Sequence, residues 1–121
     1  MAADVVVFTD AGADANVVSV ATAAILKYID WGTGATGADP ANTAMQTAGA
    51  ESRATGTISH VVDREYKVVG AMTCNATGKA ITEAGLFDAS TGPTMWIRAT
   101  FDAINVVQND TIQFTFTLTF T

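Results

Sequence analysis

The last eleven residues, Thr111–Thr121, constrain the fold more than any other segment. They read TIQFTFTLTFT and contain no charge, no glycine and no proline. Apolar residues alternate with threonine or glutamine, so a β-strand here has one apolar face and one polar face. A neutral strand of this kind promotes aggregation when its edge is open. We therefore predict that the strand is held between neighbouring strands. Its apolar residues Phe114, Phe116, Leu118 and Phe120 should lie in the core, with the threonines toward solvent or a sister subunit.

The rest of the chain repeats short strand-like runs separated by turn residues, which is typical of a β-sandwich or barrel. The predicted strands are Asp4–Thr9, Val17–Ala21, Ile25–Trp31, Thr55–Val62, Tyr66–Asn75, Ala80–Phe87, Met95–Asp102 and Thr111–Thr121. Several alternate apolar and polar residues as half-buried antiparallel strands do. We predict one domain, residues 1–121, of the all-β class: an antiparallel β-sandwich or jelly-roll-like fold.

One long stretch, residues 32–50, has no strand pattern and reads GTGATGADPANTAMQTAGA. It is either a long loop or a short helix that begins near Asp39–Pro40 and ends near Gly49. A loop of this length in a compact domain tends to be functional or to pack on a neighbour.

Composition and charge exclude some classes of partner. The chain has 121 residues, a net charge of −6 and no cluster of lysine and arginine, which argues against binding to nucleic acid. Hydrophobic residues make up 49% and charged residues 15%, so we expect partners to cover part of the surface. The first residues, MAADVVVFTD, lack the positive region of a signal peptide, and their apolar run is too short to span a membrane. We predict no nucleic-acid or membrane partner.

Two motifs resemble ligand-binding loops. Gly32, Gly34 and Gly37 spell the G-x-G-x-x-G of dinucleotide-binding folds, but no βαβ unit surrounds them, and we interpret them as a glycine-rich turn.

The segment DAGADAN resembles part of a calcium loop through Asp10, Asp14 and Asn16. Gly12 occupies a position where the calcium loop needs an acid, so a turn is the favoured interpretation.

Single reactive residues are weak candidates for chemistry. His60 is the only histidine, nothing positions partners for it, and we interpret it as a partly buried side chain with a backbone hydrogen bond. Cys74 is the only cysteine, so no intrachain disulfide can form, and we expect it to act as a small buried hydrophobe.

Glu83 lies in AITEAGLFD and shares a predicted face with Ile81, Gly85 and Phe87. A lone carboxylate is a weak basis for acid catalysis, since glycoside hydrolysis usually needs a pair. We predict that Glu83 pairs with Arg98 or Arg53, or accepts backbone N–H bonds, and so holds a subunit or a sheet corner together.

The four largest amphipathic aromatic residues leave two interpretations open. They form either a sugar-binding platform or, more commonly, anchors in the core or an interface. These residues are Tyr28, Trp31, Tyr66 and Trp96. From the residues as a whole we predict no catalytic, cofactor-binding or metal-binding site.

Two blocks carry a resemblance to a known family. They are KYIDWGTGATGADPANTAM, residues 27–45, and ITEAGLFDASTGPTMWIRATFDAINVVQNDTIQFTFTLTF, residues 81–120, which together cover about half the chain. They resemble small β-rich virion proteins of tailed bacteriophages, particularly the decoration or cement proteins of the capsid exterior.

The resemblance implies a structural virion protein on the capsid exterior, assembled in the cytoplasm of the bacterial host. It implies a homotrimer that stabilises the shell by bridging major capsid protein subunits, with no cofactor and no catalytic residues. Similar segments occur in phage tail and fibre proteins, so a structural or receptor-binding domain of a tail or fibre is the alternative.

Two observations distinguish the remaining functional classes. A pocket rimmed by Trp31 or Trp96 would favour a carbohydrate-binding module, whereas His60 or Glu83 in a cleft beside a second reactive group would favour a small β-fold enzyme.

Overall fold

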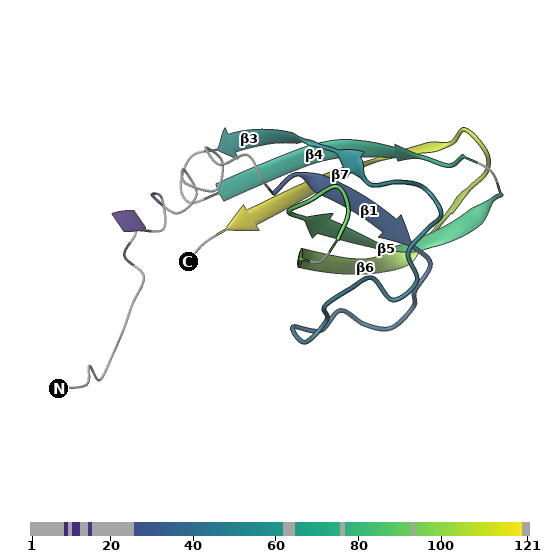
Figure 1. The fold of residues 1–121 in the computed structure, drawn as a ribbon, viewed down its shortest axis with the longest axis horizontal. Helices are drawn as coiled ribbons and strands as arrows, with labels where there is room; N and C mark the ends of the chain where they lie inside the picture. Colours follow the sequence, from purple (N-terminus) through teal and green to yellow (C-terminus); the bar gives the residue numbers. More distant parts are fainter. Residues whose placement is uncertain are drawn as a thin grey trace.

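The computed structural model describes residues 9, 11–12, 15, 26–61, 65–75, 77–92 and 94–119. All the strands in these ranges pair antiparallel, which confirms the all-β class (Figure 1). They are β1 (Tyr28–Gly32), β2 (Ala54–Thr55), β3 (Thr57–Val61), β4 (Glu65–Thr73), β5 (Lys79–Phe87), β6 (Met95–Val106) and β7 (Thr111–Thr119). The predicted strands Asp4–Thr9, apart from Thr9 itself, and Val17–Ala21 lie outside the described residues.

The strands form two sheets, ordered β2-β1-β5-β6 and β3-β4-β7. The chain passes from one sheet to the other after β2, after β4 and again after β6, and the last two crossings lie side by side. Cys74 N–H donates to the carbonyl of Asp110 at 2.8 Å, and Asn109 N–H donates to the carbonyl of Cys74 at 2.7 Å. Asn109 has φ 74°, a conformation that asparagine tolerates in tight turns. These bonds extend the pairing of β4 with β7 beyond Thr73 and Thr111, and so hold the two crossings together at one end of the sandwich.

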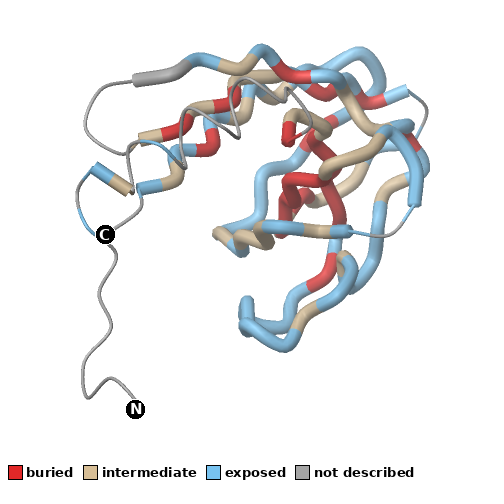
Figure 2. Tube along the Cα trace, turned by 60° about the vertical axis from the view of Figure 1, so that its left-hand side comes forward, coloured by how far each residue is buried: buried red, intermediate tan, exposed pale blue. Residues whose placement is uncertain are grey.

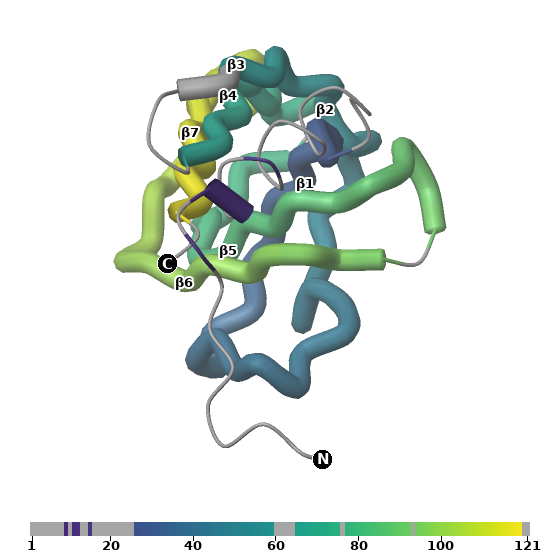
Figure 3. The backbone as a smooth tube through the Cα atoms, turned by 90° about the vertical axis from the view of Figure 1, so that its left-hand side faces the viewer, coloured from purple at the N-terminus to yellow at the C-terminus, as the bar shows by residue number. Residues whose placement is uncertain are grey.

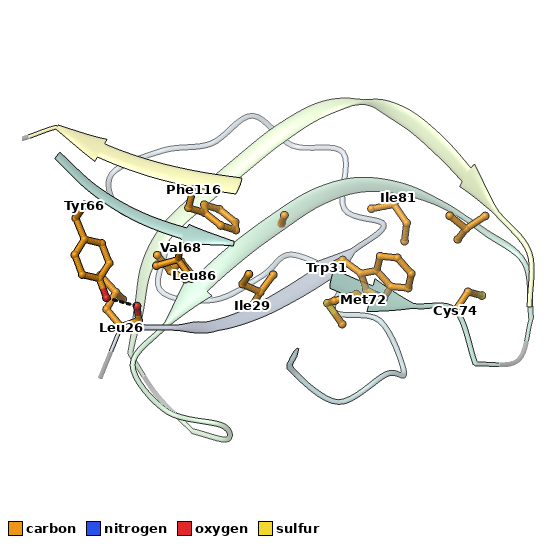
Figure 4. Packing of buried hydrophobic residues seen from close by; sticks show 12 residues of the cluster. Leu26, Ile29, Trp31, Tyr66, Val68, Met72, Cys74, Ile81, Leu86 and Phe116 are labelled. Carbon is orange, nitrogen blue, oxygen red and sulfur yellow. Dashed lines mark hydrogen bonds between the residues drawn. The ribbon is translucent and has the colours of Figure 1, made fainter. Parts of the chain in front are cut away.

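The core lies between the two sheets, where the buried segments face each other (Figure 2). Figure 4 shows its main side chains. The buried hydrophobic cluster comprises Leu26, Ile29, Trp31, Tyr66, Val68, Met72, Cys74, Ile81, Ala84, Leu86, Val106 and Phe116. The one hydroxyl in this cluster is satisfied, because Tyr66 Oη donates to the carbonyl of Leu26 at 2.6 Å. Burial raises the pKa of Tyr66 to about 12.

β7, the last described strand, has the predicted apolar and polar faces, but the structure does not show both of its predicted neighbours. Phe116 is buried, Ile112, Phe114 and Leu118 are half-buried on the same face, and the threonines are exposed. Within the described residues, however, β7 pairs with β4 alone, so only one of its two predicted neighbours is shown. The reason is topological: β6, the strand before it, belongs to the other sheet. Phe120 lies outside the described residues.

The residues between β1 and β2, which we name the outer loop (residues 33–53), contain no helix. Of the stretch 32–50, Gly32 ends β1 and the remainder is a long loop. The start signal at Asp39–Pro40 produces a single turn, in which Asn42 N–H donates to the carbonyl of Asp39 at 2.9 Å. Figure 3 shows the outer loop on the side of β5 and β6 that faces away from β3, β4 and β7. It therefore covers the outer face of the four-stranded sheet.

We predict that replacing Phe116 with alanine lowers the free energy of unfolding by about 3 kcal/mol, because it leaves a cavity at the buried centre of β7. The matched change Thr115→Ser, on the exposed face of the same strand, should cost less than about 0.5 kcal/mol. Urea unfolding measures both. Equal effects of the two changes would contradict this placement of β7.

Candidate functional site

Glu83 is the centre of the polar contacts beneath the outer loop. It projects from β5 and is fully buried. Its two oxygens accept four hydrogen bonds of 2.7–2.9 Å, from the backbone N–H groups of Gly34, Gln46 and Thr47 and from Nε of Arg98. The prediction was that Glu83 pairs with Arg98 or Arg53, or accepts backbone N–H bonds. It is confirmed with Arg98 as the partner, and the backbone bonds are present as well.

These donors determine the charge state of Glu83. Burial alone raises the pKa of the carboxyl, but the hydrogen bonds from Thr47 and Gln46, with those from Arg98 and Gly34, outweigh it and lower the pKa below 4.5. The anion is therefore the stable form. A lowered pKa means that this anchor contributes stability above about pH 4.5 and loses it as the pH falls below that value. Because both oxygens are engaged, the carboxylate is a structural anchor.

Two glycines allow the loop backbone to approach the carboxylate. A side chain on Gly34 would overlap Oε2 of Glu83, and a side chain on Gly32 would overlap the carbonyl of Thr47 as well as Glu83. At Gly37, the third glycine of the motif, an added Cβ would meet no atom within 4 Å. The G-x-G-x-x-G spacing therefore belongs to a glycine-rich turn around Glu83, as predicted.

The face that Glu83 occupies differs from the predicted one in a single respect. Gly85 and Phe87 share its outer face, beneath the side chains of Met45 and Arg53. Ile81 instead belongs to the core cluster. The pairing of β5 with β6 changes register between Ile81 and Glu83, and such a bulge re-aims the side chains on either side of it.

Arg98 connects Glu83 to the tip of the loop. Its side chain is 3% exposed, and besides the bond to Glu83 it donates to the carbonyls of Thr36 at 3.0 Å and Gly37 at 3.2 Å. It also donates to Oδ1 of Asn42 at 3.1 Å. A planar guanidinium with this many bonds holds a single geometry, so the loop tip is fixed relative to β6.

A second buried carboxylate, Glu51, anchors the end of the loop. It accepts hydrogen bonds from Trp31 Nε1 at 2.9 Å, Lys79 Nζ at 2.7 Å and Asn75 N–H at 3.1 Å. Burial opposes its charged form, but these donors, Lys79 foremost, lower the pKa of Glu51 to about 2. No sequence pattern pointed to Glu51, because its partners lie 20 to 28 residues away in the chain.

Arg53 fixes the last residue of the loop to the β5–β6 hairpin. Its guanidinium lies 3.6 Å from the centroid of the Phe87 ring, and it donates to the carbonyls of Ala89 at 2.9 Å and Gly92 at 3.0 Å. The prediction offered Arg53 as an alternative partner of Glu83, and it serves the hairpin instead.

Asp30, on β1, is the least compensated of the buried carboxylates. It is 7% exposed, and Trp31 N–H donates to it at 2.9 Å. Burial raises the pKa of Asp30 to about 6, against the opposing effects of this hydrogen bond and of the charge on Arg53. Its only sequence signal is a polar residue at an outward position of an otherwise apolar strand.

Of the other reactive candidate residues, Cys74 is the one whose side chain the structure describes, and its hydrogen-bond partner is not one of these carboxylates. Cys74 is buried, as predicted, with Sγ 3.4 Å from the carbonyl of Thr77. The side chain of His60, together with Asp10, Asp14 and Asn16, lies outside the described residues. In the described ranges no three histidine, cysteine, aspartate or glutamate side chains are placed to hold a metal ion, and no helix there has the length and apolarity to cross a membrane.

The aromatic candidates separate into buried and exposed residues. Trp31 and Tyr66 are fully buried anchors in the core. Trp96 is 46% exposed and lies beside a surface hollow of about 350 Å³, between residues 38–42 of the outer loop and residues 95–98 of β6. A hollow rimmed by Trp96 is the feature that favours a carbohydrate-binding module.

Comparison of the chain with protein-family models, with curated proteins and with solved structures finds no match.

We predict that Glu83→Gln lowers the free energy of unfolding by about 3 kcal/mol, because it leaves the buried guanidinium of Arg98 without its counter-charge. Hydrogen exchange of the Gly34, Gln46 and Thr47 amides should accelerate in the same variant. The control is Asp102→Asn on the exposed part of β6, which should change neither quantity. Unchanged protection of the three amides in Glu83→Gln would refute the anchor role.

We predict that Asp30→Asn stabilises the protein by about 1 to 3 kcal/mol at pH 8, because it removes a poorly compensated buried charge. The folded-state pKa of Asp30 is raised, so its charge costs stability above about pH 6, and this cost disappears as the pH falls toward 3.8. Thermal unfolding of both proteins from pH 4 to pH 8 measures the difference. A gain that is constant across this range would exclude titration of Asp30 as its cause.

Proposed function

We propose that this protein is a structural component of a tailed-phage virion, a decoration subunit that stabilises the capsid exterior by bridging major capsid protein subunits. The edge of β7 that has no partner strand among the described residues carries the proposal. Its nine residues, Thr111–Thr119, are uncharged, contain no proline, and pair on one side only within the described residues. Proteins that remain monomeric blunt such edges with charges, bulges or prolines. An edge without these features suits a subunit that is covered by neighbours in an assembly.

The outer loop supports the same function. Residues 33–50 contain a single charged residue, Asp39, and most of them are exposed. Small neutral side chains allow another subunit to approach closely, and depletion of charge is typical of the centre of an interface. The buried anchors beneath the loop hold it in one shape, which reduces the entropy lost on binding.

A homotrimer follows from the proposal, since a closed ring of subunits covers edges that a monomer leaves open. The expected mass is three times 12.5 kDa, about 37.5 kDa, in light scattering at tens of micromolar. Replacing Thr115 and Thr117 on β7 with lysine should shift this mass toward the monomer, because edge lysines oppose strand pairing. Thr91→Lys, in the exposed turn between β5 and β6, is the matched control.

The function itself is tested on particles. Virions made without the protein should release their genome at a lower temperature than complete virions, and purified protein added back should restore the difference, because a subunit that binds only the intact lattice stabilises it by mass action. Equal heat resistance of the two kinds of particle would contradict a decoration role even if the protein is a trimer. A monomer in solution that still restores heat resistance would contradict only the trimer.

A further inference from the structure

We propose that the hollow beside Trp96 is a binding site for one neutral pyranose ring of a carbohydrate. Its volume of about 350 Å³ is at the lower end of the range for small-molecule sites, which suits a single ring with its substituents. This inference does not depend on the virion role, because it rests on a different part of the surface from β7.

Trp96 supplies the platform. It is 46% exposed at the start of β6, although large aromatic side chains usually bury most of their area. Its Nε1 donates to Oδ2 of Asp88 at 3.2 Å, which fixes the indole ring against rotation. A fixed indole with a polar edge and an open apolar face is suited to the C–H face of a sugar ring.

The loop tip supplies a hydrogen-bond donor and an acceptor beside this platform. Oδ1 of Asn42 accepts from Arg98 Nη1 at 3.1 Å and from Asp39 N–H at 2.9 Å, which leaves the Nδ2 donor of Asn42 without a partner among the described residues. Oδ1 of Asp39 accepts from Ala41 N–H at 2.8 Å, which leaves Oδ2 of Asp39 as an acceptor without a partner among the described residues. Paired donors and acceptors of this kind recognise neighbouring hydroxyl groups.

The site is formed before any ligand arrives. Arg98 lies beneath it and joins Asn42 to the buried carboxylate of Glu83, at 3.1 Å and 2.9 Å respectively. The donor and the acceptor are therefore held in place by the anchor of the outer loop. A preformed site loses less conformational entropy on binding.

The charge around the hollow selects the class of sugar. The charge of Arg98 is compensated by Glu83, whereas Asp39 lines the hollow and the carboxylate of Asp88 accepts the hydrogen bond from Trp96. Sialic acids, uronic acids and phosphates are repelled by these groups. Pro40, Met95 and Ile97 complete the lining with apolar surface, as a neutral hexose requires.

The test uses the full-length protein labelled with ¹⁵N. The chain has two tryptophans, and only Trp96 is exposed, so their two indole N–H resonances report separately on the hollow and on the core. The probes are the methyl glycosides of β-glucose, β-galactose and α-mannose, with sorbitol as an open-chain control. We expect at least one glycoside to shift the Trp96 indole and Asn42 amide resonances saturably, with the Trp31 resonance unchanged.

Two variants and one control assign the binding. Trp96→Ala should weaken it about tenfold or more, since it removes the platform. Asp39→Asn retains the bond to Ala41 but exchanges the free acceptor for a donor, and it should weaken binding about threefold to tenfold. Thr91→Ala, in the nearby exposed turn, should bind as the parent does.

The proposal is overturned if none of the three glycosides shifts the Trp96 resonance saturably, or if sorbitol shifts it equally. It is also overturned if Trp96→Ala, with its amide spectrum otherwise preserved, binds as tightly as the parent protein.

Discussion

The buried carboxylate of Glu83 is the constraint on which the outer half of this molecule depends. An ionised group in the interior is strongly destabilising unless hydrogen-bond donors and a counter-charge surround it. Here the donors come from three backbone amides of the outer loop and from Arg98. A loop without helix or strand thereby acquires one conformation. Gly32 and Gly34 are necessary for the same reason, because only a residue without a side chain lets the backbone come so close to the carboxylate.

Local periodicity in the sequence was sufficient to predict β1, β3 to β5 and β7, together with the inward face of β7. It gave no separate β2, and it ended β6 at Asp102 instead of Val106. The partners of Glu83 were also within reach of the sequence, because a lone glutamate in an apolar strand needs compensation. The choice between a loop and a helix after Gly32 could not be made from the sequence. Gln46 and Thr47 donate their N–H groups to Glu83, 36 to 37 residues away, and not to carbonyl groups of a helix. The edge position of β7 depends on which sheet β6 joins, and alternation within a strand carries no information about that. Asp30 and Glu51 were missed because their burial is created by the folded loop.

Several charged side chains pair in the interior, so the surface of the outer loop above them carries little charge. Glu51, Glu83, Lys79 and Arg98 are engaged with one another or with the backbone, and the loop above them is nearly free of charge. A rigid, neutral loop on one side and an uncharged strand edge on the other are features suited to assembly with other subunits. The hollow at Trp96 uses the same anchor, because Arg98 joins Glu83 to Asn42. The two proposals thus depend on one electrostatic centre and share residues 38–42 of the outer loop, whereas the edge of β7 belongs to the first proposal alone.

The role of Glu83 as the organiser of the outer loop is tested most directly by a pH titration of its side-chain carboxyl carbon, followed by ¹³C NMR in the folded protein. If Glu83 organises the loop, the midpoint lies below 4.5, and the amide resonances of Gly34, Gln46 and Thr47 move together with the carboxyl as it is protonated. A midpoint at or above 4.5, with no response from the three amides, would show that Glu83 does not organise the loop.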